Sequence, residues 1–399
     1  MTASAAHYFL LVADLRYLCR RMFALIFVFV ALAAVVLPDA YLVFGPLRGH
    51  LPAWGNVVIV LSSIIILTGL ACGLAGWWND TLMRFMFGLL MCAALPKLAF
   101  VLLSAPAWGR SLWLNCAGLV LSFATLAGSA YGFACGWKRL TVHRVTLTLD
   151  RLPAAFDGYR VVQISDLHVG TFGRDASFLH TLADSIARLA PDLVVFTGDL
   201  VNSRPEEIAP FTEALSRIGA KNGVMSILGN HDYCLYDRHS SPDGAARAAQ
   251  RLVEAERTLG WQLLRNEHRA LVREGDTLYV AGVENSGRRP FPSRGDLGKA
   301  LAGIPAGAAT ILLSHDPWHW RSEVVPDGRA DLTLSGHTHA MQLKLFGFSP
   351  AQFFAREWGG LYAEGRQRLY VCTGTGGNLP FRLGAWPEIA VLELRCAKP

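Results

Sequence analysis

The first third of the chain is almost free of charge, which restricts it to folds that keep long apolar segments away from water. Only six charged residues occur between Met22 and Trp137. A helix needs about 20 apolar residues to cross about 30 Å of hydrocarbon. Apolar runs that approach this length are Met22 to Phe44, Val57 to Trp77, Phe85 to Leu103 and Leu112 to Cys135. We therefore expect a bundle of about four transmembrane helices within residues 1–140.

Lysine and arginine residues beside these runs predict the orientation, because they are retained on the cytoplasmic side of a membrane. Seven lie on one side of the expected membrane: Arg16, Arg20, Arg21, Arg84, Lys138, Arg139 and Arg144. Arg48 and Arg110 lie on the other side. This pattern places both termini, and the C-terminal domain with them, in the cytoplasm. If the first run were a cleaved signal peptide, or if one span were miscounted, the domain would lie on the opposite side.

Lys97, next to Pro96 in the third run, is the one ionisable residue expected at membrane depth. It either forms a polar site inside the bundle or reaches the interface along its own aliphatic stem. We favour the second interpretation. Because the runs show no paired acidic residues, the sequence gives little support to a channel or a transporter.

Charge is divided unevenly between the two parts of the chain. The first 150 residues carry 10 Lys and Arg against 4 Asp and Glu, and the remaining 249 carry 27 of each. The net charge of +6 therefore belongs to the N-terminal part. The balanced C-terminal part has no basic excess that would indicate nucleic acid as a partner. The eight cysteines are scattered without CxxC pairs, which argues against a disulfide framework and against a thiolate zinc site.

After a basic juxtamembrane linker at residues 141–157, short β-branched runs alternate with amphipathic helical segments. This alternation indicates an α/β domain over residues 158–399. We expect buried strands at residues 160–164, 192–196, 223–228, 277–283, 309–313, 331–334, 368–372 and 388–394. Two of the expected helices cover residues 176–189 and 205–218, and the second begins with a proline and two glutamates, as a helix start should.

Five of the expected strands are followed directly by His, Asp or Asn. The segments are Ser165-Asp166-Leu167-His168, Thr197-Gly198-Asp199, Gly229-Asn230-His231-Asp232, Ser314-His315-Asp316 and Gly336-His337-Thr338-His339. Each of these residues alone is more simply explained as a turn or a helix cap. Together they indicate a functional site, because α/β sheets place their sites beyond the ends of the strands.

The side chains in these segments are imidazole, carboxylate and amide groups, without a thiolate. Such ligands suit Mn, Fe or Zn rather than copper or an iron–sulfur cluster. Seven candidate ligands exceed what one tetrahedral ion uses, so we expect two divalent metal ions. Two ions about 3.5 to 4 Å apart polarise a phosphoryl group and generate a nucleophile near neutral pH.

The ordered series of motifs resembles the calcineurin-like metallophosphoesterase superfamily over most of residues 158–395. The tail of the chain resembles the branch of membrane-attached bacterial members and the animal transmembrane protein with such a domain. The matching segments are Gly374-Thr375-Gly376-Gly377, Leu379-Pro380-Phe381-Arg382 and Pro387-Glu388-Ile389. The resemblance implies a two-sheet α/β/β/α sandwich with the site at the strand ends, attached to a bacterial inner membrane.

The resemblance also implies a role for each matching residue. Asp166, His168 and His339 would bind the first metal, Asp199 would bridge both ions, and Asn230, His315 and His337 would bind the second. A hydroxide bridging the metals would attack phosphorus in line, and His231, oriented by Asp232, would stabilise the leaving group or protonate it. The chain departs from the family at Ala340-Met341-Gln342, where related members often have two glycines and a glutamine. This departure affects the following loop rather than the ligands.

Basic and aromatic residues near these motifs bear on the choice of substrate. Lys344 and Arg356 lie in a loop, residues 343–358, that also holds four phenylalanines and a tryptophan. This loop is either an interfacial surface that admits a lipid-linked phosphoester or a lid packed against the protein itself. Arg288 and Arg289, together with Arg294, either clamp a second phosphate, as in a pyrophosphate substrate, or belong to a solvated loop.

These features predict a membrane-anchored, binuclear-metal phosphohydrolase that cleaves phosphoester or pyrophosphate bonds. The anchor and the aromatic loop favour a lipid-linked or nucleotide-lipid substrate. The expected partners are the lipid bilayer and a phosphorylated small molecule or lipid, with no nucleic acid and no inferable protein partner. The alternative is a catalytically weak signalling or scaffold protein with a metal-binding domain. Such a protein is expected to have lost a ligand or His231, and this chain has them all.

Overall fold

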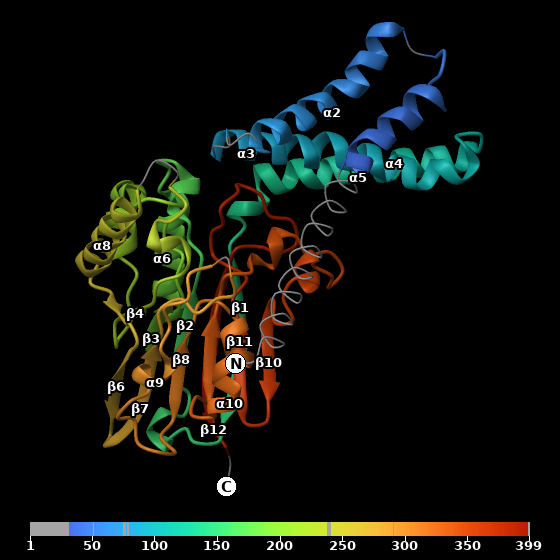
Figure 1. Cartoon of the computed structure of the whole chain (residues 1–399). Helices are drawn as coiled ribbons and strands as arrows, with labels where there is room; N and C mark the ends of the chain where they lie inside the picture. The colour runs from blue at the N-terminus through green and yellow to red at the C-terminus, as the bar shows by residue number, and fades with distance from the viewer. Residues whose placement is uncertain are drawn as a thin grey trace, which may run out of the picture. The chain divides into compact units, whose positions relative to one another are not determined.

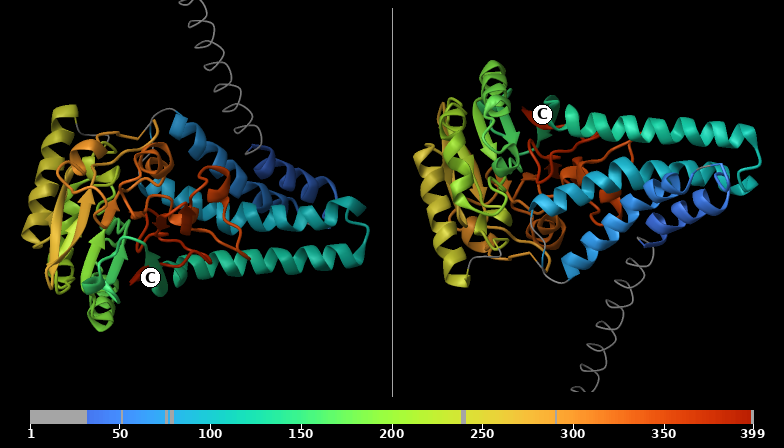
Figure 2. Two further views of the ribbon diagram at one scale, coloured as in Figure 1. Left: turned by 90° about the horizontal axis from the view of Figure 1, so that it is seen from below. Right: turned by 90° about the horizontal axis from the view of Figure 1, so that it is seen from above.

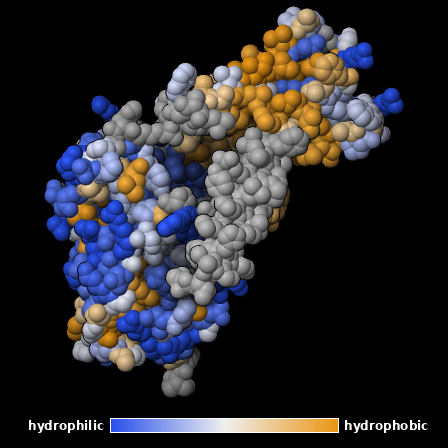
Figure 3. All heavy atoms as spheres, in the orientation of Figure 1, coloured by the Kyte–Doolittle hydropathy of each residue, from blue (hydrophilic) through white to orange (hydrophobic). Residues whose placement is uncertain are grey.

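The computed structural model of this chain describes residues 32–50, 52–74, 77, 80–237, 241–289 and 291–397. The chain divides into two compact units, Met1–Tyr131 and Gly132–Pro399. Their surfaces differ in kind. The described residues of the first unit are mostly hydrophobic on the face shown in Figure 3, and those of the second are mostly hydrophilic.

The first unit contains helical segments that are long and apolar enough to cross a membrane. Three of them, at Ala53–Cys72, Thr81–Ala107 and Leu112–Lys138, correspond to the second, third and fourth expected spans. The described part of the first expected span is a shorter apolar helix, Leu32–Phe44. Residues 22–31 of that span, and the three arginines before it, lie outside the described residues. The long apolar helices indicate a membrane protein.

The labelled helices of this unit are α2 (Ala53–Leu74), α3 (Asp80–Leu89), α4 (Leu95–Ser104) and α5 (Leu112–Ala134), and the last turn of α5, from Gly132, belongs to the second unit (Figure 1). Helices α3 and α4 belong to one continuous span, joined by a π-helical turn at Leu90–Ala94. Pro96 accounts for this wide turn. Proline has no N–H to donate, and in a regular α-helix its ring would clash with the carbonyl oxygen four residues earlier.

Lys97 forms a polar cluster within the first unit, which agrees with the first interpretation from the sequence and not with the one that we favour. Its ammonium forms an ion pair with Asp39 and donates to the hydroxyl groups of Ser62 and Ser63, both at 3.1 Å. It also donates to the carbonyl oxygen of Ile59 at 3.0 Å. Three helices contribute to this cluster, and Asp39 is buried. An ammonium group is stable at such a position only when it is paired.

The second unit is built on two mixed six-stranded sheets. The first sheet has the strand order β1-β12-β2-β3-β4-β5, formed by Thr141–Leu149, Glu388–Cys396, Arg160–Ile164, Leu193–Phe196, Val224–Ser226 and Gln262–Leu263. The second has the order β10-β11-β9-β8-β7-β6, formed by Gly360–Glu364, Gln367–Val371, Leu332–Ser335, Thr310–Leu313, Asp276–Gly282 and Glu267–Arg273. Strands β2 to β5 are mutually parallel, as are β7, β8, β9 and β11. Their carboxyl ends therefore share one edge of each sheet.

Apolar side chains between the sheets form the central core. The first sheet contributes Val161 and Val195 to this cluster, and the second contributes Val280, Ile311 and Leu334. Burial of each such side chain stabilises the fold by about 1.5–3 kcal/mol. Helices cover the outer faces: α6 (Ser177–Leu189) and α8 (Pro242–Thr258) on the first sheet, and α9 (Leu297–Ala300) and α10 (Val325–Asp327) on the second (Figures 1 and 2). The expected two-sheet α/β/β/α sandwich is confirmed.

Strands at the sheet edges and one helix differ from the sequence predictions. Thr141–Leu149, which lies within the expected linker, forms β1 and pairs with β12. Only two of its residues are buried, so it lacks the apolar run that marks a central strand. The edge strands β6 and β10 are exposed in the same way. The helix expected at residues 205–218 is a 3₁₀ helix, Pro205–Phe211, followed by α7 (Thr212–Ser216), because Pro210 interrupts regular α-helical bonding.

Candidate metal centre

The ends of five strands bring the expected site residues together. Asp166 and His168 follow β2, Asp199 follows β3, Asn230 and His231 follow β4, His315 follows β8, and His337 and His339 follow β9. His231 and His337 are half-buried, and the others are buried. Buried carboxylates and imidazoles are costly unless a partner compensates them, so this concentration of polar groups requires an explanation.

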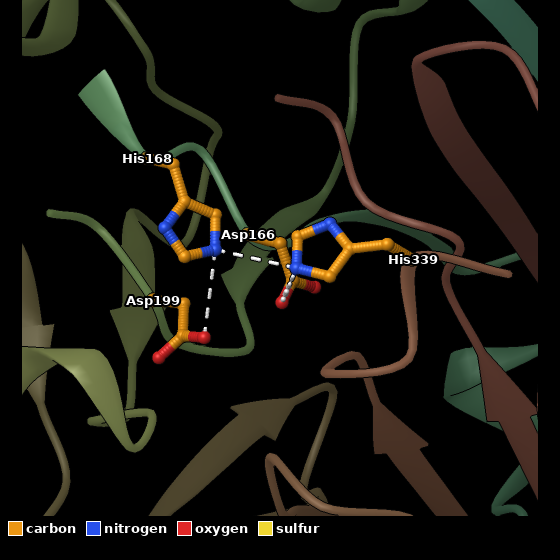
Figure 4. A group of neighbouring side chains, drawn as sticks. All are labelled: Asp166, His168, Asp199 and His339. Carbon is orange, nitrogen blue, oxygen red and sulfur yellow. Dashed lines mark hydrogen bonds and ion pairs between the residues drawn. The ribbon is translucent and has the colours of Figure 1, made fainter. Parts of the chain in front are cut away.

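Four of these residues form a first candidate metal group. Ligand atoms of Asp166, His168, Asp199 and His339 all lie within 4.8 Å of one another. His168 Nε2 lies 3.3 Å from His339 Nε2 and 3.6 Å from Asp199 Oδ2, and His339 Nε2 lies 3.3 Å from Asp166 Oδ1 (Figure 4). Burial, reinforced by the nearby His231, lowers the pKa of His168 to about 3. Burial likewise keeps the pKa of His339 well below its ordinary value. Neutral imidazoles beside carboxylates are suitable ligands for a divalent cation.

A second candidate group shares Asp199 with the first and adds His315 and His337. His315 Nδ1 donates to the carbonyl oxygen of Thr197 at 2.7 Å, which leaves Nε2 as the atom that faces Asp199 Oδ2 at 3.2 Å. Burial opposes a charge on His315, but Asp199 and Asp166 outweigh it and raise the pKa of His315 to about 10. The buried carboxylates thus require a positive charge at this point, which is what a metal ion supplies.

Asn230 provides an independent test of whether the residues present fit a metal. Its Oδ1 atom is buried and has no hydrogen-bond partner among the described residues. Its Nδ2 atom donates to the hydroxyl oxygen of Tyr236 at 2.9 Å. A buried acceptor without a donor is rare in proteins. An amide oxygen of this kind is a suitable ligand for a divalent ion, so the donor set fits metal binding.

The loops that carry these residues are strained. Asp166, His168, Asp199, His337 and His339 all have positive φ angles, between 44° and 72°. Non-glycine residues rarely adopt this region, and clusters of them are found at active sites. A glycine allows the loops to approach one another: a Cβ atom on Gly336 would collide with the side chains of Ser165 and Asp166. The fold therefore accepts backbone strain in order to bring these side chains together.

His231 lies beside the first group but is oriented differently from our expectation. Its Nδ1 atom donates to the carbonyl oxygen of Asn202 at 2.6 Å, so Nε2 remains available. The ring meets that of His168 edge to face, with centroids 4.7 Å apart. The carboxylate of Asp232 does not orient His231. It accepts instead from the backbone N–H groups of Asp199, Leu200 and Gly229 at 2.7, 2.8 and 2.9 Å. Asp232 thus holds the two loops that carry the candidate ligands.

Two further residues of the site have no signal as ligands in the sequence. Tyr236 accepts from Asn230, and its ring packs on that of His231 with centroids 4.3 Å apart. Arg382 is fully buried and donates to the carbonyl oxygens of Gly376 and Ala385. The N–H of Gly376 donates to the carbonyl oxygen of Asp166 at 3.0 Å, so Arg382 fixes a loop that supports the first group. The only sequence indication for Arg382 is the tail motif.

A cavity of about 830 Å³ lies next to the second group. His337 lines it together with apolar residues, including Phe291, Trp318, Met341, Phe353 and Phe354, and with charged residues, including Asp316, Arg321 and Glu357. Of the expected substrate-binding residues, Arg288 and Arg356 line this cavity and Arg289 and Lys344 do not. The ammonium of Lys344 lies over the ring of Trp358 instead, 5.5 Å from its centroid, and Arg294 packs on Tyr233 at 4.6 Å. The expected cluster of three arginines is therefore not assembled around one phosphate position.

The fold and the Asp and His cluster are those expected of a metal-dependent phosphoesterase domain. Residues 159–341 match the family model described as calcineurin-like phosphoesterase. The chain is 30% identical over 281 residues to a transmembrane protein with metallophosphoesterase domain from Danio rerio, in an alignment that covers 67% of this chain and 60% of the relative. This chain therefore carries a calcineurin-like metallophosphoesterase domain. The family and the buried Asp and His cluster indicate divalent metal ions as cofactors.

Two bacterial relatives cover more of their own length. The chain is 29% identical over 295 residues to the uncharacterized metallophosphoesterase YkuE from Bacillus subtilis. This alignment covers 70% of this chain and 94% of the relative. It is also 29% identical over 305 residues to UDP-2,3-diacylglucosamine pyrophosphatase LpxG from Chlamydia trachomatis. That alignment covers 64% of this chain and 89% of the relative. The resemblance stated from the motifs is thus confirmed.

Proposed function

We propose that this chain is a membrane-anchored phosphohydrolase with a binuclear metal centre, which cleaves phosphoester or pyrophosphate bonds. The observation that carries the proposal is the pair of ligand groups that share the buried carboxylate of Asp199. A shared carboxylate between two sets of imidazole and oxygen ligands is the arrangement that holds two metal ions close together.

Each ligand has a place in this proposal. Asp166, His168 and His339 would hold one ion, Asn230, His315 and His337 would hold the other, and Asp199 would be shared between the two. The donor set suits Mn, Fe or Zn. When bound, the two ions polarise the phosphoryl oxygens and lower the pKa of water, so that hydrolysis proceeds near neutral pH. Thr197, through its carbonyl oxygen, fixes the tautomer of His315 with Nε2 directed at the ion.

His231 acts on the leaving group. The bond from its Nδ1 atom to the carbonyl oxygen of Asn202 directs Nε2 toward the site, and a proton on Nε2 is available to the departing oxygen. Half-burial of His231 leaves that face accessible to a substrate. The ring of Tyr236 packs on His231 and limits its rotation.

The substrate that we propose combines a phosphoester or a pyrophosphate with an apolar group. The cavity beside His337 supports this, because one part of its lining is apolar, with Phe291, Trp318, Phe353 and Phe354, and Arg288, Arg321 and Arg356 lie on its walls. Guanidinium groups suit phosphate oxygens, and the apolar wall suits a lipid chain. The name of the related LpxG enzymes, which is that of a pyrophosphatase for a diacylated sugar nucleotide, agrees with a lipid-linked or nucleotide-lipid substrate.

We also propose that the catalytic unit faces the cytoplasm. The excess of lysine and arginine beside one end of the apolar spans supports this orientation. Protease treatment of sealed inside-out vesicles tests it, because the catalytic unit is then expected to be digested. Protection of the unit in such vesicles would place it on the opposite side.

A catalytically weak signalling or scaffold protein is the alternative, and the complete ligand set argues against it. The test is hydrolysis of a generic aryl phosphodiester and an aryl phosphomonoester by purified protein with Mn²⁺. We expect Asp199→Ala and His231→Ala each to lower turnover by about 10²–10⁴-fold, because one removes the shared ligand and the other the acid. Asp184→Ala and His180→Ala, which change exposed residues of α6, are matched controls and should retain wild-type rates. Equal activity of all five proteins would refute the assignment.

A further inference from the structure

The segment after the last metal motif carries an unusually exposed hairpin. Leu345 and Phe348 exchange backbone hydrogen bonds of 2.8 and 2.9 Å around a two-residue turn formed by Phe346 and Gly347. Leu345 and Phe348 are exposed, and Phe346 is fully exposed. Isolated exposed apolar residues are common, but a hairpin with three of them side by side indicates a contact surface.

The backbone conformation of the turn disfavours a residue such as phenylalanine at position 346. Phe346 and Gly347 both have positive φ angles, 51° and 83°. A turn of this type prefers Asn or Asp at the first position and Gly at the second. Phenylalanine is disfavoured there because its Cβ atom crowds the backbone in the left-handed region. The chain therefore keeps a strained, bulky, apolar residue at a tip where folding alone would select a small polar one.

The hairpin is tied to the end of the last apolar helix through contacts within the second unit. Lys344 N donates to the carbonyl oxygen of Leu383 at 2.8 Å, and Leu383 N donates to that of Gln342 at 3.0 Å. The backbone N–H of Arg382 donates in turn to the carbonyl oxygen of Gly132, in the last turn of α5, at 3.3 Å. The rings of Phe133 and Phe381 lie 4.8 Å apart. The segment at residues 381–383 thus contacts both the hairpin segment and the end of α5, which is long enough to span a membrane.

We infer that the Leu345–Phe348 hairpin inserts into the interfacial layer of the lipid bilayer. The continuity with α5 selects the bilayer as the occupant of this surface, because a helix that crosses the membrane keeps the lipid surface within reach of everything fixed to its end. Aromatic and leucine side chains at a loop tip are the residue types that partition into this layer. The inference rests on the proposed anchoring by α5 and does not depend on which bond the site hydrolyses.

Insertion of the hairpin would also define how a substrate enters. Met341, Phe353 and Phe354 line the cavity beside His337, and they belong to the same segment of the chain as the hairpin. Holding this segment at the lipid surface places the apolar wall of the cavity next to the acyl chains of the bilayer. A substrate with a lipid chain then reaches the metal centre without passing through water.

Quenching of a fluorescent amino acid by lipids tests this inference in the full-length protein. The label is introduced genetically at position 346, at position 123 of α5 or at position 272 of β6, and each variant is reconstituted in vesicles of phosphatidylethanolamine and phosphatidylglycerol. All three positions carry exposed apolar residues, Phe346, Phe123 and Val272. The quencher is a phosphatidylcholine with a doxyl group near the head of its acyl chain.

We expect the labels at positions 346 and 123 to be quenched at least about three-fold more than the label at position 272. Quenching at position 123 with none at position 346 would refute the hairpin insertion and leave the anchoring intact. The absence of quenching at both positions would refute the anchoring and the insertion together. Wild-type protein in vesicles with a photoreactive acyl chain provides a measurement without substitution. Lipid cross-links are expected on the Leu345–Phe348 peptide, and their absence there would contradict the insertion.

Discussion

The two units of the chain bury charged groups in opposite ways. In the helical unit the ammonium of Lys97 has an acidic partner, two hydroxyl groups and a carbonyl oxygen, so its hydrogen-bonding capacity is used within the unit. In the catalytic unit the Oδ1 atom of Asn230 is buried without a hydrogen-bond partner among the described residues. The first cluster is complete as a structural element. The second is complete only when a ligand joins it.

This difference separates a polar group that stabilises the protein from one that performs its chemistry. Both clusters contain residues that are far apart in sequence and both are buried. Burial and charge are therefore insufficient to identify a functional site. The informative property is a group of buried carboxylate and imidazole atoms within ligand distance of one another, beside an amide oxygen that the protein itself leaves unsatisfied.

Among the changes that test this difference between the two clusters, metal removal should have the largest effect on activity and stability. Chelation of a preparation active with Mn²⁺ is expected to lower turnover by about 10⁴-fold, because the metals supply both polarisation and the activation of water. The melting temperature should fall as well, since an ion that binds only the folded state at about 1,000 times its Kd contributes about 4 kcal/mol.

Asp199→Asn tests whether the loss of activity and of thermal stability on chelation depends on metal bound at the shared carboxylate. Asparagine preserves the shape of the shared ligand and removes its charge, so added Mn²⁺ is expected to raise neither the activity nor the melting temperature of this variant. The matched control is Asp184→Asn on the exposed face of α6, which should respond to Mn²⁺ as the wild type does. A chelated wild-type protein with full activity and unchanged melting would show that the catalytic cluster, like the cluster around Lys97, needs no ligand.

Sequence patterns predicted the catalytic cluster better than the membrane cluster for a physical reason. Each candidate ligand stands directly after a strand, and the parallel strands β2, β3 and β4 bring their ends to one edge, so the placement follows from local rules. The pairing of Lys97 with Asp39 joins helices whose mutual packing no periodicity reveals. The same limit applies to Asn202, whose carbonyl oxygen orients His231 and whose side-chain type carries no information about that role.

The strands of the sheets also differ in how well the local sequence predicts them. Central strands such as β3, in which every residue is buried, are marked by a continuous apolar run. Strand β1 is exposed on most of its length and depends on its pairing with β12, which is more than 200 residues away in the chain, so the sequence indicates only a basic linker there. The role of Asp232 was misassigned because its partners are backbone N–H groups, which have no sequence signature.

Removal of one charge from the membrane cluster should have the next largest effect. Lys97→Met leaves the carboxyl group of Asp39 buried without its cation, and loss of one partner of a buried pair typically costs about 3–5 kcal/mol. The expected result is a marked fall in the thermal stability of the purified protein in detergent. The double variant Lys97→Met/Asp39→Leu should recover part of that loss because no charge remains to be paired.

Lys138→Met is the matched control for that experiment. It removes a lysine whose partner, Asp175, is exposed, and such pairs contribute at most about 1 kcal/mol. If Lys97→Met were no more destabilising than Lys138→Met, the cluster around Lys97 would not be the structural element that we describe.

Glu256 is a buried carboxyl group outside both clusters, and its contribution to the stability of the fold should depend on pH. This residue of α8 is fully buried and accepts a hydrogen bond from Ser226 at 2.6 Å, and burial raises the pKa of Glu256 to about 8. The folded state therefore keeps a proton that the unfolded state loses at lower pH. The resulting contribution to stability is present below the ordinary glutamate pKa and is lost as the pH rises to about 8.

Glu256→Gln tests this contribution because glutamine mimics the protonated form. Between pH 5 and pH 9 the wild type should lose about 4 kcal/mol more stability than the variant, followed through the difference between their melting temperatures at each pH. Other titrating groups cancel in this comparison. Parallel pH profiles for the two proteins would mean that the carboxyl group is already ionised in the folded state.

The smallest expected effect concerns the orientation of one ligand. Tyr236→Phe keeps the ring that packs on His231 and removes the hydroxyl group that accepts from Asn230 Nδ2. The amide is then free to turn its oxygen away from the ion, and loss of a group that orients a ligand lowers metal affinity by about 10-fold or more. The expected result is a higher Mn²⁺ concentration for half-maximal activity, with a rate at saturating Mn²⁺ close to that of the wild type.

Tyr159→Phe is the matched control for Tyr236→Phe. The hydroxyl group of Tyr159 likewise bonds to an asparagine side chain, Asn222, at 2.8 Å, but Tyr159 is buried in the core between the sheets, whereas Tyr236 is exposed. This variant should lose stability without a change in its response to Mn²⁺. An unchanged Mn²⁺ response in Tyr236→Phe, or an equal change in both variants, would show that Asn230 does not need its hydroxyl partner. The distinction between a self-sufficient cluster and one completed by a ligand would then rest on Asp199 and the histidines alone.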